Sequence, residues 1–131
     1  MAAAESYPDD LLYHPEHDWA RIDGDEAVLG ITWYAHDQLG ELVHYEPPAV
    51  GAQIEKGKSY GEVESVKAVS DVIAPLSGEV LEVNDQVVGA PETVNEDPYG
   101  NGWLLRIRMA DSGETDALLD VGAYRELLAN Q

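Results

Sequence analysis

The 131-residue chain carries 26 acidic residues against 7 basic ones, a formal net charge of −19 at pH 7. Such a charge repels phosphate backbones and anionic lipid surfaces, which argues against nucleic-acid binding and membrane binding. The absence of cysteine excludes disulfides, thiolate metal sites and a cysteine nucleophile. With 44% hydrophobic residues we expect a single domain over residues 1–131, with a core at about 13–110 and a helical segment at about 115–130.

The beginning of the chain predicts a cytoplasmic protein. No apolar run approaches membrane-spanning length, and residues 1–6 lack the positive start and apolar core of a secretory signal. The first basic residue is Arg21, whereas a mitochondrial transit peptide is rich in arginine. Because the acids are spread along the whole chain, they indicate a charged folded surface and a partner with a basic docking face. We expect the chain itself to be a monomer.

The first third of the chain predicts a hairpin followed by a short helix. Turn-forming residues at 23–25 separate two strand-like runs, 19–22 and 26–31. Thr32 is placed to cap a helix over 33–39, and a glycine follows as a stop signal. Just before the hairpin, two histidines and two acids lie close together. Their spacing matches no helical or finger pattern of metal ligands, so we expect no metal there.

A weak internal repeat indicates two similar halves. Gly40–Val43 resembles Gly78–Leu81, and Val50–Ala52 resembles Val88–Ala90, both at an offset of 38 residues. Such a repeat on either side of a central hairpin predicts two half-sheets related by a pseudo-two-fold axis. Short Gly-Glu-Val strings also recur by chance in β proteins, so the residues alone leave this repeat open.

The C-terminal third predicts a strand and then helix. A segment dense in turn formers, 95–102, leads into an apolar strand at 103–109. Apolar residues at helical spacing form one face of the segment 115–130. We expect Gly122 to break this segment into two pieces, with Asp120 capping the second.

The central stretch, residues 61–73, predicts a hairpin with Lys67 at its tip. Valines alternate with small or polar residues on both sides of this lysine. The other two lysines of the chain, Lys56 and Lys58, lie together in a glycine-containing connection. An isolated amine at a hairpin tip suits covalent modification. A lysine whose stem covers apolar surface while its head stays hydrated is the alternative that the residues alone leave open.

The segment Glu64–Asp71, followed by residues 74–80, resembles the lipoyl-lysine segment of the glycine cleavage system H protein family. His17-Asp18-Trp19 and several later motifs match as well, so the resemblance runs from about Tyr13 to Tyr124. It implies a mainly β fold, a flattened barrel-sandwich hybrid of the lipoyl and biotinyl type. Two pseudo-symmetric half-sheets would carry a short internal helix and a C-terminal helix.

The resemblance also implies a function. Lipoic acid would be attached to Lys67 through an amide, by a lipoate ligase or lipoyltransferase. The arm would carry an aminomethyl group from the P protein, glycine decarboxylase, to the T protein, aminomethyltransferase. The L protein, dihydrolipoamide dehydrogenase, would then reoxidise it. In this reading the chain is a carrier and has no catalytic residue of its own.

Further site residues follow from the same resemblance. Glu16, His17, Asp18 and Asp71 stand where the family has residues near the loaded arm, and the acids among them suit a carried ammonium group. The family has serine where this chain has Glu16, and glutamate where it has Asp18. Glu64, together with Ser65, is the candidate for recognition by the ligase or by partners.

Three alternatives stand beside this interpretation. A lipoyl domain of a 2-oxoacid dehydrogenase usually has Asp-Lys-Ala at the tip and lacks the helical C-terminus. A biotinyl domain has methionines where this chain has Val66 and Ala68. An H-like protein that donates or relays lipoate, or binds partners without modification, would use the same hairpin.

Overall fold

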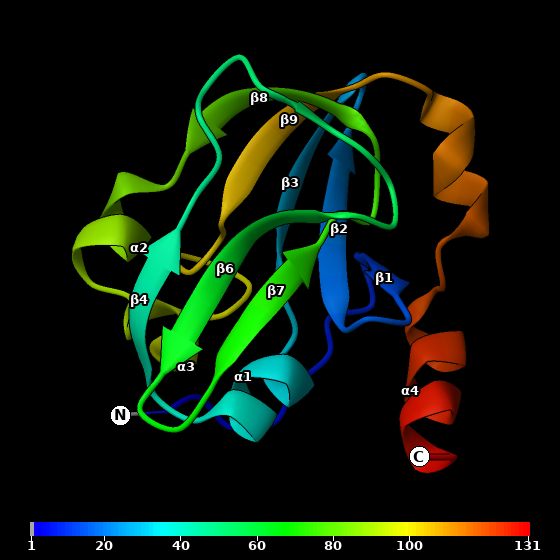
Figure 1. Ribbon diagram of the computed structural model, residues 1–131. Helices are drawn as coiled ribbons and strands as arrows, with labels where there is room; N and C mark the ends of the chain where they lie inside the picture. The colour runs from blue at the N-terminus through cyan, green and yellow to red at the C-terminus, as the bar shows by residue number, and fades with distance from the viewer. Residues whose placement is uncertain (1) are drawn as a thin grey trace.

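Two antiparallel β-sheets form the framework of the computed structural model, which describes residues 2–131 (Figure 1). The larger sheet has the order β1 (Leu12–His14), β2 (Asp18–Asp23), β3 (Glu26–Ile31), β9 (Leu105–Met109), β8 (Gly78–Val83) and β5 (Gln53–Ile54). The smaller sheet has the order β4 (Leu42–Glu46), β6 (Ser59–Ser65) and β7 (Val69–Ile73). The predicted first hairpin and central hairpin are confirmed as β2–β3 and β6–β7.

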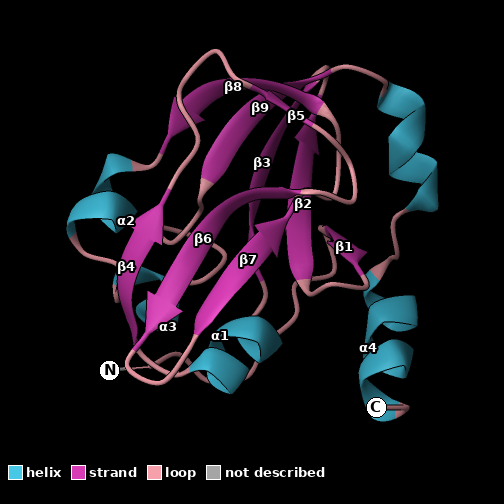
Figure 2. Cartoon of the chain, in the orientation of Figure 1, coloured by secondary structure: helices cyan, strands magenta, loops and turns pink. Residues whose placement is uncertain are grey.

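Short helices lie around the sheets (Figure 2). They are α1 (Trp33–Leu39), α2 (Asp85–Gly89), α3 (Thr93–Glu96), a 3₁₀ helix (Ser112–Ala117) and α4 (Val121–Ala129). The sequence predicted α1 and the C-terminal helical segment but not α2 and α3. None of these helices, within residues 2–131, is long and apolar enough to cross a membrane.

The ends of α1 are fixed by the residues that predicted them. The Thr32 side chain accepts a hydrogen bond from the Ala35 amide at 3.3 Å, which satisfies a free donor of the first turn. Gly40 ends the helix with φ of 89°, a conformation that favours glycine, and its amide donates to the His36 carbonyl at 2.8 Å.

The C-terminal segment breaks earlier than predicted. Leu119 is extended because its amide and carbonyl pair with those of Tyr13, both at 2.7 Å. Asp120 then caps α4 by accepting from the Ala123 amide at 2.8 Å, as predicted. The prediction that Gly122 forms the break is wrong, since Gly122 lies inside α4. A tertiary β-bridge, not the glycine, divides the two helices.

The internal repeat is only partly reflected in the fold. Its first pair falls on β4 and β8, one strand in each sheet. Its second pair differs in conformation, because Gly51 lies in a turn with φ of 90° whereas Gly89 ends α2. The two sheets also differ in size, with six and three strands.

The core has two parts. Apolar side chains of both sheets form the larger cluster, which includes Leu29, Leu42, Val63, Leu76, Val80, Leu104 and Ile107. A smaller cluster of aromatic residues joins α4 to β1 and β2, and contains Tyr7, Leu11, Tyr13, Trp19, Tyr99 and Tyr124. This second cluster fixes the C-terminal helix to the body of the protein.

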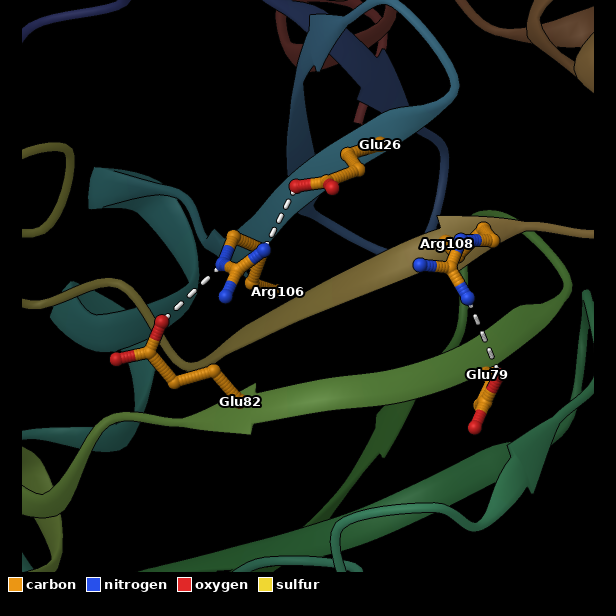
Figure 3. Close-up of polar contacts among 5 residues, drawn as sticks. All are labelled: Glu26, Glu79, Glu82, Arg106 and Arg108. Atoms are coloured by element: carbon orange, nitrogen blue, oxygen red, sulfur yellow. Dashed lines mark hydrogen bonds and ion pairs between the residues drawn. The ribbon is translucent and has the colours of Figure 1, made fainter.

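The larger sheet carries cross-strand ion pairs (Figure 3). Arg106 on β9 lies between Glu26 on β3 and Glu82 on β8, at 2.7 and 3.1 Å. Arg108 pairs with Glu79 at 3.6 Å. These arginines neutralise part of the acidic surface on that sheet.

Candidate functional site

Lys67 lies at the tip of the β6–β7 hairpin, as predicted. The strands pair antiparallel up to Glu64 and Val69, and residues 66–68 form the connecting turn. Figure 1 shows this turn at the end of the molecule where α1 lies. The Lys67 side chain is exposed, and its amine forms no ion pair with any residue in 2–131. It is therefore open to modification.

The Ser65 side chain fixes the turn. Its hydroxyl oxygen accepts hydrogen bonds from the Lys67 and Ala68 amides at 3.2 and 3.1 Å. Its own amide donates to the Ala68 carbonyl at 2.8 Å. Because Ser65 is only 5% exposed and its hydroxyl is used internally, the structure gives it a role in shaping the tip.

The lysine stem lies over the end of α1. A Cβ atom placed on Gly40 would lie 3.7 Å from Cε of Lys67, so the two residues are in close contact. Asn95 holds Gly40 in place, since the side-chain amide nitrogen of Asn95 donates to the Gly40 carbonyl at 2.9 Å. The oxygen of the same amide accepts from the Leu42 backbone at 2.9 Å. In the sequence, Asn95 is only the first residue of the turn-forming segment 95–102, and nothing there indicates this role.

The surroundings of the tip are apolar and acidic. Val66, Val69 and Val43 are 75%, 59% and 49% exposed, which is unusual for aliphatic side chains on a folded domain. Glu64 is exposed on β6, opposite His44 on one side and Val69 on the other. The predicted recognition residue Glu64 therefore points away from the body.

A cleft of about 230 Å³ lies between α1, β7 and the segment before β2. It is lined by Glu16, His17, Tyr34, Ala35, Gln38, Leu39, Ser70, Asp71 and Ile73. Three of the four predicted arm contacts, Glu16, His17 and Asp71, are thus brought together. Leu39 directly precedes the glycine that contacts the lysine stem, so the cleft begins beside the attachment point.

Asp18, the fourth predicted contact, does not line the cleft. Its side chain is 2% exposed, and its Oδ2 atom has no hydrogen-bond partner among residues 2–131. Burial, with a smaller contribution from Glu16, raises its pKa well above the usual value of a carboxyl group. The buried hydroxyl of Tyr60 likewise has no partner within the described chain. Asp18 is therefore a buried carboxyl group and not a surface anion.

His17 is held in an unusual backbone conformation at the edge of the cleft. Its φ of 73° is rare for a residue other than glycine, and it is maintained by backbone bonds to His14 and Thr32 at 2.8 and 3.0 Å. Its Nδ1 lies 2.9 Å from the Tyr124 hydroxyl, and its ring contacts Tyr34 at a centroid distance of 4.5 Å. Burial lowers the pKa of His17, so the imidazole is neutral at pH 7.

Comparison with known proteins identifies close relatives. A family model described as glycine cleavage H-protein matches residues 11–131. The chain is 50% identical over 124 residues to the glycine cleavage system H protein of Anaeromyxobacter sp. (strain K), covering 95% of this chain and 97% of that protein. It is 48% identical over 124 residues to the glycine cleavage system H protein of Thermus thermophilus, with the same coverage.

A solved structure is similar in fold. The crystal structure of a glycine cleavage system H protein from Mycobacterium marinum matches with a TM-score of 0.87 and 41% sequence identity. The match covers 94% of this chain and 99% of that chain. The expected mainly β fold of two antiparallel sheets, a barrel-sandwich hybrid with short helices, is confirmed.

Proposed function

Because this chain belongs to the glycine cleavage H-protein family, we propose that its lipoyl group is attached to Lys67. The chain is the lipoyl shuttle of the glycine cleavage system, a carrier without catalysis of its own, as the sequence predicted. Its partners are the P, T and L proteins. The observation that carries the assignment is the exposed Lys67 amine on a turn fixed by Ser65.

The residues around Lys67 fit such an attachment. Amide formation at Nζ replaces the cationic end group of Lys67 with a neutral one. Lys67 takes part in no ion pair among the described residues, so this change breaks none. The lysine contributes a flexible stem, while the strands and Ser65 hold its backbone in place. The lipoyl group supplies the reactive disulfide, and the chain supplies a fixed anchor and a cleft beside it.

In the proposed cycle the cleft receives the loaded end of the arm between visits to partner enzymes. The aminomethyl cargo, passed from the P protein to the T protein, is cationic at neutral pH. Glu16 and Asp71 line the cleft and place carboxylates where they can pair with this ammonium group. His17 lines the same cleft. Asp18 is outside the lining, so we assign it no contact with the cargo.

Loading of Lys67 requires a lipoate ligase or lipoyltransferase that recognises the hairpin. We assign this contact to Glu64, whose exposed side chain lies on the outer face of β6 three residues before the lysine. The proposal includes a monomer acting in the cytoplasm. A net charge of −19 on each copy opposes association of two copies.

Intact-mass measurement with peptide mapping tests the attachment site. Protein made in a lipoate-competent host is expected to carry one lipoyl group, lost in Lys67→Ala and kept in Lys56→Ala and Lys58→Ala. These two lysines are matched controls, because both lie in the turn that precedes β6. Full modification of Lys67→Ala would end the proposal.

A further inference from the structure

A chain of hydrogen bonds connects α1 and α4 to His17 in the arm cleft. The Ala35 amide donates to the Thr32 hydroxyl at 3.3 Å. This hydroxyl lies 2.8 Å from the Tyr124 hydroxyl, which in turn lies 2.9 Å from Nδ1 of His17. Thr32 and Tyr124 are both fully buried, so water does not compete for the bond between their hydroxyls, while the bonds to Ala35 and His17 are partly buried.

The direction of the bonds follows from the need to pair every buried donor. Thr32 already accepts from a backbone amide, and its own proton has one hydroxyl or nitrogen acceptor within reach among residues 2–131, the Tyr124 oxygen. Tyr124 must then donate its proton to His17. In the opposite direction the Thr32 proton would be buried without a partner. One arrangement alone satisfies all three groups.

We propose that Tyr124 is the positioning residue that holds His17 as the Nε2–H tautomer and keeps its imidazole at the cleft. Because Nδ1 accepts from Tyr124, the single proton of the neutral ring resides on Nε2. Nε2 is therefore a donor. The side-chain nitrogen of Gln131 lies 3.5 Å from it, so this exposed amide must turn its oxygen toward the imidazole, and so long and exposed a contact does not outweigh the shorter bond at Nδ1. The C-terminal helix thus becomes a part of the carrier site.

Tyr124 is suited to this role because its ring cannot move. It stacks on Tyr13 at a centroid distance of 4.6 Å with an interplanar angle of 7°, and it meets the edge of Tyr7 at 5.6 Å. Its hydroxyl is consequently fixed relative to β1 and to Thr32 at the start of α1. His17 is less enclosed, since its side chain is only half-buried and its ring packs on Tyr34 at 4.5 Å and meets the edge of Tyr124 at 5.9 Å.

The consequence for the cargo rests on the proposed function of the cleft. A carried ammonium group loses its proton more readily beside a nitrogen lone pair than beside an N–H group. With Nε2 protonated, the cleft offers it two carboxylates and no neutral base at His17. The charged and titratable groups that face His17 are Glu16, His14, Tyr34 and Tyr124, while Asp71 lines the same cleft.

The first experiment uses the unlipoylated protein and ¹⁵N NMR of the His17 ring. In wild type we expect one protonated nitrogen, Nε2, and an Nδ1 signal typical of a lone pair that accepts a hydrogen bond. In Tyr124→Phe we expect the Nδ1 signal to move to that of a free lone pair or of averaged tautomers. Tyr13→Phe is the matched control, because it removes a buried hydroxyl bonded to the Pro8 carbonyl at 2.6 Å.

Two further variants keep this test decisive. Thr32→Ser retains the hydroxyl and Thr32→Val removes it, and both are expected to keep the wild-type Nδ1 signal, because Tyr124 keeps its proton for His17 in each. Unchanged Nδ1 signals in folded Tyr124→Phe would overturn the proposal. This outcome is independent of whether Lys67 is the attachment site.

The second experiment measures the lifetime of the aminomethyl-loaded protein, after mass analysis has confirmed loading at Lys67. Tyr124→Phe is expected to shorten it several-fold, and Tyr13→Phe to leave it unchanged. In a His17→Gln background the Tyr124→Phe effect is expected to vanish, since it acts through the imidazole. If Tyr124→Phe shortened the lifetime equally in the wild-type and His17→Gln backgrounds, Tyr124 would have a merely structural role, and the positioning of His17 would be refuted.

Discussion

Asp18 lies beside the arm-site residues in the sequence but is turned away from the cleft in the structure. The motif His17-Asp18-Trp19 places an acid beside the arm site, yet β2 turns this carboxyl group inward, opposite Ile31 of β3. An ionised carboxylate there would lack solvent and lacks a hydrogen bond at Oδ2. The raised pKa of Asp18 therefore favours the neutral acid in the folded state.

This burial predicts a specific pH dependence of stability. Consider a pH between the pKa of Asp18 in the unfolded chain, about 4, and its raised pKa in the folded protein. At such a pH the folded state keeps the Asp18 proton that the unfolded state has released. Stability contributed by Asp18 is thus present at low pH and lost as pH rises through that window. Asp18→Asn removes the titration, so its stability relative to wild type is expected to increase from pH 4 to pH 8.

The expected increase is about 1.4 kcal/mol for each unit by which the folded pKa is raised. Chemical denaturation of both proteins at a series of pH values measures it, and the comparison cancels the other acids. A difference between Asp18→Asn and wild type that stays constant with pH would contradict a buried neutral acid.

Sequence reasoning identified residues whose role is local and missed those whose role depends on distant contacts. Lys67 was predicted because its turn lies within a few residues of it. The role of Tyr124 was not, because its partner His17 is 107 positions away. In the sequence, Tyr124 was one of several apolar residues at helical spacing, and nothing there distinguishes the hydroxyl that reaches the His17 ring.

The same division holds for secondary-structure elements. The helix α1 was predicted because Thr32 and Gly40 lie at its own ends. The helices α2 and α3 were missed, since five and four residues are too few to establish a helical period. The break before α4 was misplaced at Gly122 because the bridge between Leu119 and Tyr13 is a tertiary contact.

The β2–β3 hairpin depends on close contact between one glycine and one tryptophan. A Cβ atom on Gly30 would lie 2.5 Å from Cε2 and Cζ2 of Trp19. The indole cannot move aside easily, since it is fully buried and donates to the Pro98 carbonyl at 3.1 Å. Gly30→Ala is therefore expected to destabilise the fold by about 1–3 kcal/mol through overpacking.

Gly89→Ala provides the matched comparison for that prediction. A Cβ atom there meets no atom within 4 Å, and the residue lies at the end of α2 without a positive φ. It is expected to be neutral or to stabilise by up to about 1 kcal/mol, because alanine restricts the unfolded chain. Thermal unfolding of both variants decides the matter, and equal melting temperatures would contradict the role of the Trp19 contact.

At the scale of the whole molecule, the acidic charge is distributed unequally between the sheets. On the larger sheet, Arg106 and Arg108 pair with glutamates of neighbouring strands (Figure 3). On the smaller sheet, Glu46 lies opposite Glu62, which lies opposite Asp71. Like charges directly opposite one another destabilise a sheet, so this row opposes the packing that holds the Lys67 hairpin.

Salt is therefore expected to stabilise the protein. The Debye length falls from about 30 Å at 0.01 M to about 3 Å at 1 M, which screens repulsion among exposed charges. With a net charge of −19, the repulsion that salt relieves is larger than the attraction that it removes from the few ion pairs. A gain of about 1 kcal/mol would raise Tm by about 4 °C.

The row on the smaller sheet makes this salt effect assignable to particular residues. Glu62→Gln removes the central charge of the row. It is expected to increase the free energy of unfolding by about 0.2–1 kcal/mol for each repulsive pair removed, and so to raise Tm at low salt. Its gain is expected to shrink as sodium chloride is added, because screening has then already weakened the repulsion.

Glu79→Gln is the control on the other sheet, where the charge pairs with Arg108, so its Tm at low salt is expected to fall slightly. The measurement is Tm of the three proteins across the salt series. If Glu62→Gln lowers Tm at low salt, the row does not act as a repulsive one, and Glu62 must have a favourable interaction in the folded state.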